Sequence, residues 1–256
     1  MAIGARRYHC AMRATFVLIL ASLLGAAVFA ADGYAERQLL RADPDALPAD
    51  AMLLRFAVAR GGALFLTRCA ACHGVSGSGD PATGVPNLTD DDWLYGSGRV
   101  AEIERVIDYG IRSHNPKALN LAIMPAYARP QPKDKNIQPL SPKEIGDLIE
   151  FLLRGQGRQA DENAASRGAA LFAGPGGCYD CHSLDAKGDS AIGAPNLSDE
   201  ITLYGDGSRD ALYMSIAYGR QGVCPAWINR VSAAGIRELA SYVYAISHPG
   251  AIQHAY

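Results

Sequence analysis

The sequence predicts an all-α protein made of two tandem copies of one helical unit. The first observation behind this prediction is an internal repeat. The offset that carries Cys69 onto Cys178 also matches, without a gap, three pairs of segments: 84–88 with 193–197, 94–96 with 203–205, and 109–110 with 218–219. The second observation is that apolar residues recur at three- and four-residue spacing in both copies, as in amphipathic helices. A chain of 256 residues is long enough to bury two small cores.

The N-terminus resembles an export signal. Arg6, Arg7 and Arg13 precede an uncharged stretch, 14–31, that ends in small residues. Because this pattern is typical of a secretory signal peptide, we expect residues 1–30 to be cleaved near Ala30. The stretch is also long enough to cross a bilayer, so an uncleaved membrane anchor is the alternative. Either way, the rest of the chain is predicted to lie in the periplasm, and its net charge of −2 gives no sign of a nucleic-acid partner.

The first domain is predicted to span residues 51–155, after a polar leader at 31–50. Its opening apolar helix leads into Cys69. Its last helix begins at Ser141, where a cap, a first-turn proline and a capping-box glutamate coincide, and ends at Gly155. Two of its segments have apolar residues at helical spacing: Ile103, Val106 and Ile107, and then Ile145, Leu148, Ile149 and Leu152.

The second domain is predicted to span residues 165–250, after a polar linker at 156–164. Its last helix runs from about 233 to 247, because Pro249 cannot continue it. The apolar residues that share a face in its helices are Leu212 and Ile216, and then Ile236, Leu239, Ala240 and Val243.

Both copies contain the motif Cys-x-x-Cys-His: Cys69, Cys72 and His73 in the first, and Cys178, Cys181 and His182 in the second. This motif is typical of covalent heme c attachment, in which two thiols add to the heme vinyl groups and the adjacent histidine ligates the iron. The alternative is a zinc site or a thioredoxin-like dithiol. A histidine after both copies, in a chain predicted to be exported, favours two covalently bound c-type hemes.

Several segments resemble known cytochromes: Cys69-Ala-Ala-Cys-His-Gly, Pro86-Asn-Leu-Thr-Asp, Trp93-Leu-Tyr-Gly and Gly219-Arg-Gln-Gly-Val-x-Pro-Ala-Trp. Both units resemble class I cytochrome c, and they are more closely similar to the paired periplasmic domains in the dihaem subunit of cbb-type cytochrome oxidases. That resemblance implies a fold of two tandem class I cytochrome c domains, His/Met ligation of both hemes and a membrane-anchored subunit. It also implies that the carbonyls of Pro86 and Pro195 accept hydrogen bonds from the ligand histidines, which fixes the imidazole rings.

The distal ligands differ between the two copies. Met124 lies in the first unit in the sequence Met-Pro-Ala-Tyr, and we expect it to be the sixth ligand of the first heme. The second unit has Cys224 in the equivalent Cys-Pro-Ala-Trp, and we expect its thiolate to ligate the second heme. The alternatives for Cys224 are a free thiol beside a five-coordinate heme, a dimer-forming cysteine, or replacement as ligand by Met214.

Other candidate residues have weaker signals. We expect three histidines to be exposed to solvent and not to ligate iron: His114, His248 and His254. Three aromatic residues are candidates to contact the heme propionates, with core packing as the equal alternative: Trp93, Tyr95 and Tyr204.

These features favour an electron carrier over an enzyme. Two hemes in series would pass single electrons between respiratory partners, either periplasmic redox proteins or a membrane oxidase or dehydrogenase; an uncleaved N-terminus would add membrane contact. The alternative is a thiosulfate-type oxidoreductase with the Cys224-ligated heme as its active site. A basic pocket beside Cys224, formed by Arg220 or Arg230, would favour that alternative.

Overall fold

The computed structural model describes residues 30–131 and 137–253. The expectations for residues 1–29 and for His254 therefore lie outside the described residues. Residues 30–41 are helical. The elements that follow are η1 (Pro44–Ala49), α2 (Ala51–Arg68), α3 (Ala70–His73), α4 (Val100–Tyr109), α5 (Pro142–Gly155), α6 (Glu162–Phe172), α7 (Tyr179–His182), α8 (Arg209–Tyr218), α9 (Ala233–Ser247) and α10 (Pro249–Gln253). Within these residues there are only isolated β-bridges and no strand, so the predicted all-α class is confirmed.

The helix boundaries follow from local capping chemistry. At the start of α5, the Ser141 amide donates to the Glu144 carboxylate at 2.7 Å, and the Glu144 amide donates to the Ser141 hydroxyl at 3.3 Å. Asp161 caps α6 in a similar way, as its carboxylate accepts from the Ala164 amide at 2.8 Å. These caps give a hydrogen-bond partner to amides in the first turn that have none within the helix. Without such a cap, the helix is less stable. Helix α6 begins at Glu162, inside the segment that the sequence suggested as a linker.

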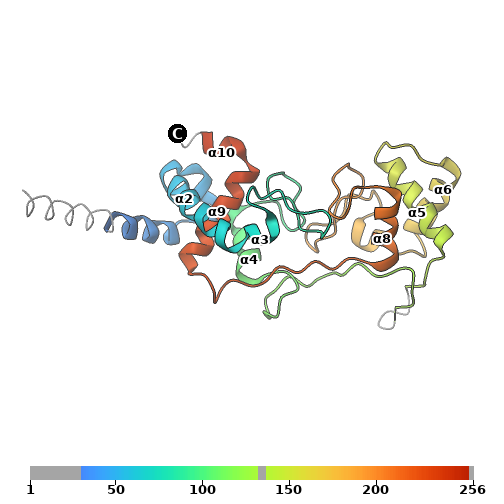
Figure 1. Ribbon diagram of the computed structural model, residues 1–256, viewed down its shortest axis with the longest axis horizontal. Coiled ribbons are helices and arrows are strands. Elements are labelled where there is room, and N and C mark those ends of the chain that lie inside the picture. The colour runs from blue at the N-terminus through green and yellow to red at the C-terminus, as the bar shows by residue number, and fades with distance from the viewer. Residues whose placement is uncertain (1–29, 132–136, 254–256) are drawn as a thin grey trace, which may run out of the picture.

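The helices form two lobes joined by loops (Figure 1). In one lobe, α9 packs against α2 and α4, and in the other, α5 packs against α6 and α8. Helix α9 is the last helix of the second repeat, yet it packs on α2 and α4 of the first repeat. Helix α5 is the last helix of the first repeat, yet it packs on α6 and α8 of the second. The repeats at 51–155 and 165–250 are therefore not the units that fold in space, because each lobe takes its last helix from the other repeat.

The two exchanged helix contacts have the same chemistry. A Cβ at Gly61 of α2 would overlap the carbonyl of Glu238 in α9, and a Cβ at Gly168 of α6 would overlap the carbonyl of Asp147 in α5. Each close approach is flanked by an ion pair: Arg60 with Glu238, and Arg167 with Asp147. Each is also flanked by an aromatic pair: Phe65 with Tyr242 at 5.1 Å between ring centroids, and Phe172 with Phe151 at 4.9 Å. Only glycine allows these backbones to approach so closely.

The predicted leader is part of the first lobe. Leu39 and Leu47 are fully buried in the core formed with α2, α4 and α9. Arg237 of α9 donates to the carbonyl of Leu39 at 3.0 Å and pairs with Glu104 at 2.7 Å. The segment predicted as a polar leader therefore packs on this lobe, which its sequence did not indicate, because single leucines in a polar segment give no helical period.

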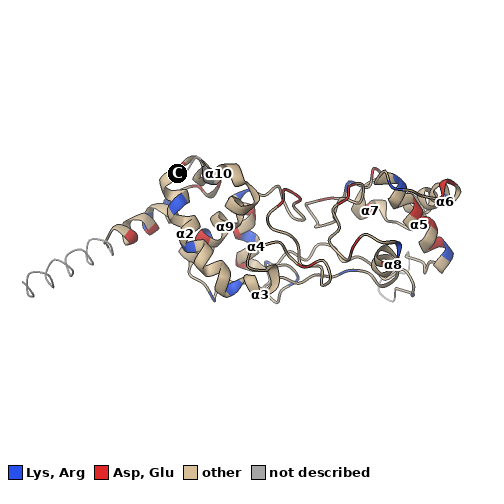
Figure 2. Cartoon of the chain, turned by 45° about the horizontal axis from the view of Figure 1, so that its top comes forward, with Lys and Arg blue, Asp and Glu red and all other residues tan. Residues whose placement is uncertain are grey.

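Residues of both charges are mixed along the described chain (Figure 2). Figure 2 shows basic and acidic residues interspersed on both lobes in that view. No helix in residues 30–131 and 137–253 combines the length and the hydropathy needed to cross a bilayer.

Candidate functional site: two cysteine-histidine motifs in one cavity

The first motif lies on the short helix α3, directly after α2. His73 Nδ1 is 3.2 Å from the carbonyl oxygen of Pro86. Because a carbonyl only accepts, Nδ1 carries the proton and the Nε2 lone pair is available to a metal. Burial lowers the pKa of His73, and the hydrogen bond to Pro86 opposes this effect only in part. This direction favours the neutral imidazole, the form that can ligate iron.

The second motif repeats this geometry on α7. His182 Nδ1 lies 3.0 Å from the carbonyl oxygen of Pro195, and burial again lowers the pKa of the imidazole. The contacts with Pro86 and Pro195 are those that the resemblance implied. They fix both rings by the same backbone device, a proline carbonyl thirteen positions after the histidine.

One cavity of about 1060 Å³ connects the two motifs. This volume lies at the top of the range of about 300–1000 Å³ that holds a single small ligand. Its walls are largely apolar, and the potential metal or thioether ligands on them are Cys69, Cys72, His73, Met124, Cys178, Cys181, His182 and Cys224. The donor set therefore fits two covalently attached hemes, one at each Cys-x-x-Cys-His motif.

Cys224 lies beside the first motif, not the second. Burial, together with the charges of the nearby Cys69 and Cys72, raises the pKa of the Cys224 thiol to about 11. The backbone of Cys224 is held by Ile111 at the end of α4, with N–O distances of 2.9 and 3.0 Å. Trp227, three residues after Cys224, is held by the same helix, because its amide donates to the Ile107 carbonyl at 3.0 Å.

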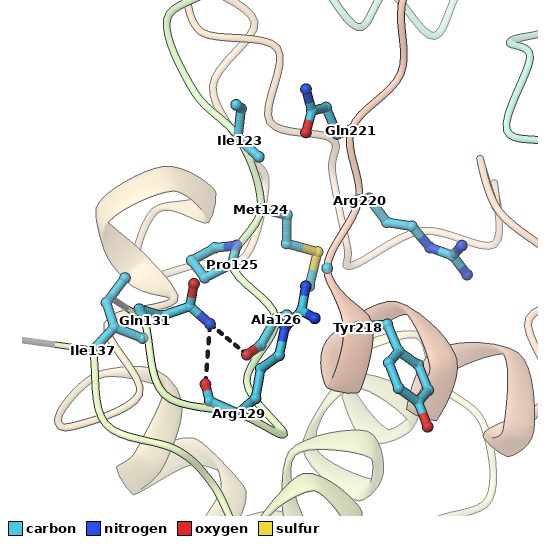
Figure 3. Close-up of a pocket in the computed structure, with 11 residues that line it drawn as sticks. Ile123, Met124, Pro125, Ala126, Arg129, Gln131, Ile137, Tyr218, Arg220 and Gln221 are labelled. Atoms are coloured by element: carbon cyan, nitrogen blue, oxygen red, sulfur yellow. Dashed lines mark hydrogen bonds between the residues drawn. The ribbon is translucent and has the colours of Figure 1, made fainter. Parts of the chain in front are cut away.

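Met124 lies beside the second motif. Its side chain packs against the buried cluster that contains Phe172 and Ile216, with Cys178 at the edge of the same cluster. Figure 3 shows Met124 next to the segment that carries Arg220, close to the end of α8. The Met124 amide donates to the Arg220 carbonyl at 3.2 Å. Burial and the adjacent Cys178 thiol raise the pKa of Tyr127, which places this residue of the first repeat against the second motif.

The pairing expected from chain order is therefore not the one in the structure. We expected Met124 with the motif of its own repeat and Cys224 with the motif at 178–182. The structure instead brings Cys224 to the motif at 69–73 and Met124 to the motif at 178–182. The reason is the helix exchange, because the segments after α4 and α8 each cross to the opposite lobe (Figure 1). Their contacts agree with this crossing, since the backbone of Cys224 hydrogen-bonds to Ile111 after α4 and that of Met124 hydrogen-bonds to Arg220 after α8.

The remaining candidates lie away from the two motifs or at the join between lobes. Met214 is 50% exposed and His114 is exposed, as expected for residues that are not ligands. His248 is half-buried and stacks on Tyr244 at 4.3 Å between ring centroids, so the expectation of solvent exposure was only partly right. The candidate aromatic residues all line the cavity: Trp93, Tyr95 and Tyr204.

Sequence reasoning missed three residues that shape the site. Gln131 holds the Met124 segment through hydrogen bonds from its Nε2 to the carbonyls of Ala126 at 2.6 Å and Arg129 at 3.1 Å, which Figure 3 shows beside a smaller pocket of about 490 Å³. Tyr127 follows Met124 in the motif but gave no signal of its own. Arg112 has a positive φ of 48°, which no sequence pattern indicated.

The arginines suggested for a sulfur-anion pocket have other contacts. The Arg220 guanidinium lies 4.2 Å from the Tyr204 ring centroid, and its Nε donates to the Ser215 hydroxyl at 3.0 Å. The Arg230 guanidinium lies 3.9 Å from the Trp227 ring. Arg220 lines the same cavity as Cys224, but none of these contacts joins either guanidinium to the Cys224 thiol, so they give the thiosulfate-type alternative no support.

Comparison with known proteins agrees with this description. A family model described as cytochrome c matches residues 58–156, and one described as cytochrome c oxidase, cbb3-type, subunit III matches residues 163–243. The CcoP subunit of a cbb3-type cytochrome c oxidase from Rhodobacter capsulatus is 39% identical, over 82% of this chain and 69% of its own. The CcoP subunit from Cereibacter sphaeroides is 36% identical, over 82% of this chain and 68% of its own. FixP from Bradyrhizobium sp. (strain ORS 278) is 39% identical, over 77% of this chain and 63% of its own.

The expected cofactor and family are thereby confirmed. Each cytochrome domain contributes one Cys-x-x-Cys-His motif, so the chain carries two covalently bound c-type hemes. A cavity lined by histidine nitrogen and by cysteine and methionine sulfur, two cytochrome domains and similarity over four-fifths of the chain lead to one conclusion. The chain belongs to the CcoP/FixP family of dihaem cytochrome c subunits of cbb3-type oxidases.

Proposed function

We propose that this chain is the electron-transferring dihaem subunit of a membrane-bound cbb3-type oxidase, with both cytochrome lobes in the periplasm. The observation that carries this proposal is the single cavity lined by both attachment motifs. Two hemes in one cavity exchange electrons over a short path, and the chain needs no substrate pocket for that task. Residues 1–30 serve as the export signal or as the membrane anchor.

The axial ligands of this proposal are exchanged between the repeats. His73 and Cys224 ligate the first heme, and His182 and Met124 ligate the second. Support comes from the position of Cys224 near Cys69 and of Met124 near Cys178. Coordination to iron deprotonates a thiol, so the raised pKa of the heme-free Cys224 thiol does not prevent ligation.

The two ligand sets order the potentials of the sites. Heme c supplies one-electron redox chemistry at its iron. The thiolate of Cys224 favours Fe(III) and lowers the potential of the first site, whereas the thioether of Met124 favours Fe(II) and raises the potential of the second. Within the chain, electron transfer from the first site to the second is therefore downhill.

Association and turnover test this function. The chain is tagged in its native host and purified from solubilised membranes, and oxygen consumption is measured with a reduced c-type cytochrome as donor. We expect a heme-copper oxidase to copurify, and we expect a chain with Cys178→Ala and Cys181→Ala to assemble but to lose donor-driven oxygen consumption. A wild-type chain that purifies without an oxidase, or full oxygen consumption by the variant, would contradict the proposal.

A further inference from the structure

The side chain of Arg112 lies between the two segments that carry the distal sulfur atoms. Its Nε donates to the carbonyl of Gly222 at 2.5 Å, and its Nη1 donates to the carbonyl of Ala122 at 2.9 Å. Gly222 lies two positions before Cys224, and Ala122 lies two positions before Met124. One guanidinium therefore hydrogen-bonds to both backbone segments that lead to the distal sulfur residues.

The same guanidinium reaches the histidine side of the second motif. Nη1 of Arg112 also donates to the hydroxyl of Tyr95 at 3.1 Å. The Tyr95 ring packs so closely on Gly193 that a Cβ at that glycine would overlap it. Gly193 lies in the loop that ends at Pro195, whose carbonyl fixes His182. A continuous chain of contacts thus runs from His182 to both distal segments.

The backbone of Arg112 shows that its position is imposed by these contacts. Its φ of 48° is in the left-handed region, which is strained for a residue other than glycine. The Arg112 amide donates to the Leu119 carbonyl at 2.8 Å, which closes the turn in front of the Met124 segment. Strain of this kind persists only where the surrounding contacts over-determine the conformation.

No carboxylate side chain of the described residues pairs with Arg112. Arg112 is half-buried on the wall of the heme cavity. Among the residues that the structure describes, it takes part in no ion pair, and its three hydrogen-bond partners are neutral oxygens. A positive charge in a partly desolvated wall is weakly screened, so it favours the reduced, less positive form of any nearby iron.

We propose that Arg112 is a positioning residue that couples the two heme sites. It fixes the spacing of the Met124 and Cys224 segments and places one positive charge beside both sites. The inference rests on the exchanged ligand set proposed above. If this proposal holds, the redox potentials of the two heme sites do not vary independently, because one side chain affects the geometry and the potential of both.

Three variants of the heme-loaded chain test this coupling: Arg112→Gln, Arg112→Lys and Arg105→Gln. Gln removes the positive charge and the planar guanidinium. Lys keeps the charge but cannot donate to the Gly222 and Ala122 carbonyls at the same time. Arg105 is an exposed arginine of α4 and serves as the matched charge control. The measurements are the midpoint potential of each heme, the sulfur-to-iron charge-transfer band and the low-spin EPR signals, with mass and helical circular dichroism as checks of assembly.

We expect Arg112→Gln to lower both midpoints and to broaden both ligand signals, and Arg105→Gln to change neither. Arg112→Lys should restore the potentials in part but leave both ligand signals broadened. A shift at one heme only, or at none, would overturn the coupling, and an Arg112→Lys protein identical to wild type would overturn the positioning role. The exchanged ligand set is tested separately by a chain with Cys69→Ala and Cys72→Ala, in which the remaining heme shows which sulfur ligates it, so failure of the ligand assignment is distinguishable from failure of the coupling.

Discussion

Ile111 and Cys224 exchange two backbone hydrogen bonds although they belong to different repeats. The Ile111 amide donates to the Cys224 carbonyl at 2.9 Å, and the Cys224 amide donates to the Ile111 carbonyl at 3.0 Å. This paired contact anchors the Cys224 segment to the end of α4, in the lobe of the first motif. These two hydrogen bonds therefore help to hold the cysteine near the motif at residues 69–73.

Replacing Cys224 by methionine should make the two sites alike. In Cys224→Met, a neutral thioether replaces the thiolate, so Fe(III) at the first site loses its charge compensation. We expect the lower midpoint to rise by on the order of hundreds of millivolts, within the roughly 0.8 V that axial ligands span. Potentiometric titration followed in the visible spectrum measures the change, and unchanged midpoints would show that the thiol is not a ligand.

Gly110 should be intolerant of a side chain because of the crossing segment. It has a φ of 75°, and a Cβ there would overlap the Cys224 carbonyl. We expect Gly110→Ala to cost about 1–3 kcal/mol of unfolding free energy and to perturb the EPR signal of the cysteine-ligated heme. The control is Gly146→Ala in α5, where a Cβ meets no atom within 4 Å and alanine favours the helix.

Urea denaturation followed by circular dichroism measures both glycine variants. The control should be as stable as wild type or more stable by about 0.5–1 kcal/mol. If Gly110→Ala matched the control in stability and in its EPR signal, the Cys224 segment would not lie against this glycine.

Asp147 should make the stability of the second lobe depend on acid pH. Hydrogen bonds from Arg167, at 2.7 and 2.9 Å, outweigh burial and lower the pKa of the Asp147 carboxyl to about 2, from an ordinary value of 3.8. A lowered folded-state pKa stabilises the fold above pH 3.8, and this contribution disappears as pH falls toward 2. We expect about 1–2 kcal/mol, because the partner guanidinium is half exposed.

The variant Asp147→Asn checks this pH dependence. Its unfolding free energy should lie below that of wild type at neutral pH and converge with it between pH 4 and about 2. Asp185→Asn, whose carboxylate is exposed and pairs only loosely with Lys187 at 3.7 Å, is the control and should follow wild type throughout. A constant difference for Asp147→Asn down to pH 2 would contradict the assigned ion pair.

The sequence was sufficient for the local features of the fold. Helix starts such as Ser141 depend on side chains within one turn, so spacing alone predicts them. The Cys-x-x-Cys-His motif predicted the two histidines as proximal ligands, and the family resemblance implied their contacts with the proline carbonyls. His73 and Pro86 illustrate this local character.

Pairing over long distances was not predictable from one sequence. Helices α5 and α9 have similar apolar stripes, and their partners have the same arginine-glycine pair, Arg60-Gly61 or Arg167-Gly168. By its sequence pattern, α5 or α9 could therefore pack against either lobe. The patterns alone do not distinguish the exchanged arrangement from the one in which each repeat keeps its own last helix. The exchange is decided by the path of the crossing segments, which depends on tertiary contacts such as those of Arg112.

The most direct test of the exchanged ligands is the spectrum of a chain with one heme removed. In a protein with Cys69→Ala and Cys72→Ala, only the heme at Cys178 and Cys181 remains covalently attached, which mass spectrometry verifies. The account predicts that this heme retains the sulfur-to-iron charge-transfer band of Met124 ligation and shows no thiolate-type EPR signal. A thiolate-type signal without that band would place Cys224 on the heme of its own repeat and contradict the exchange.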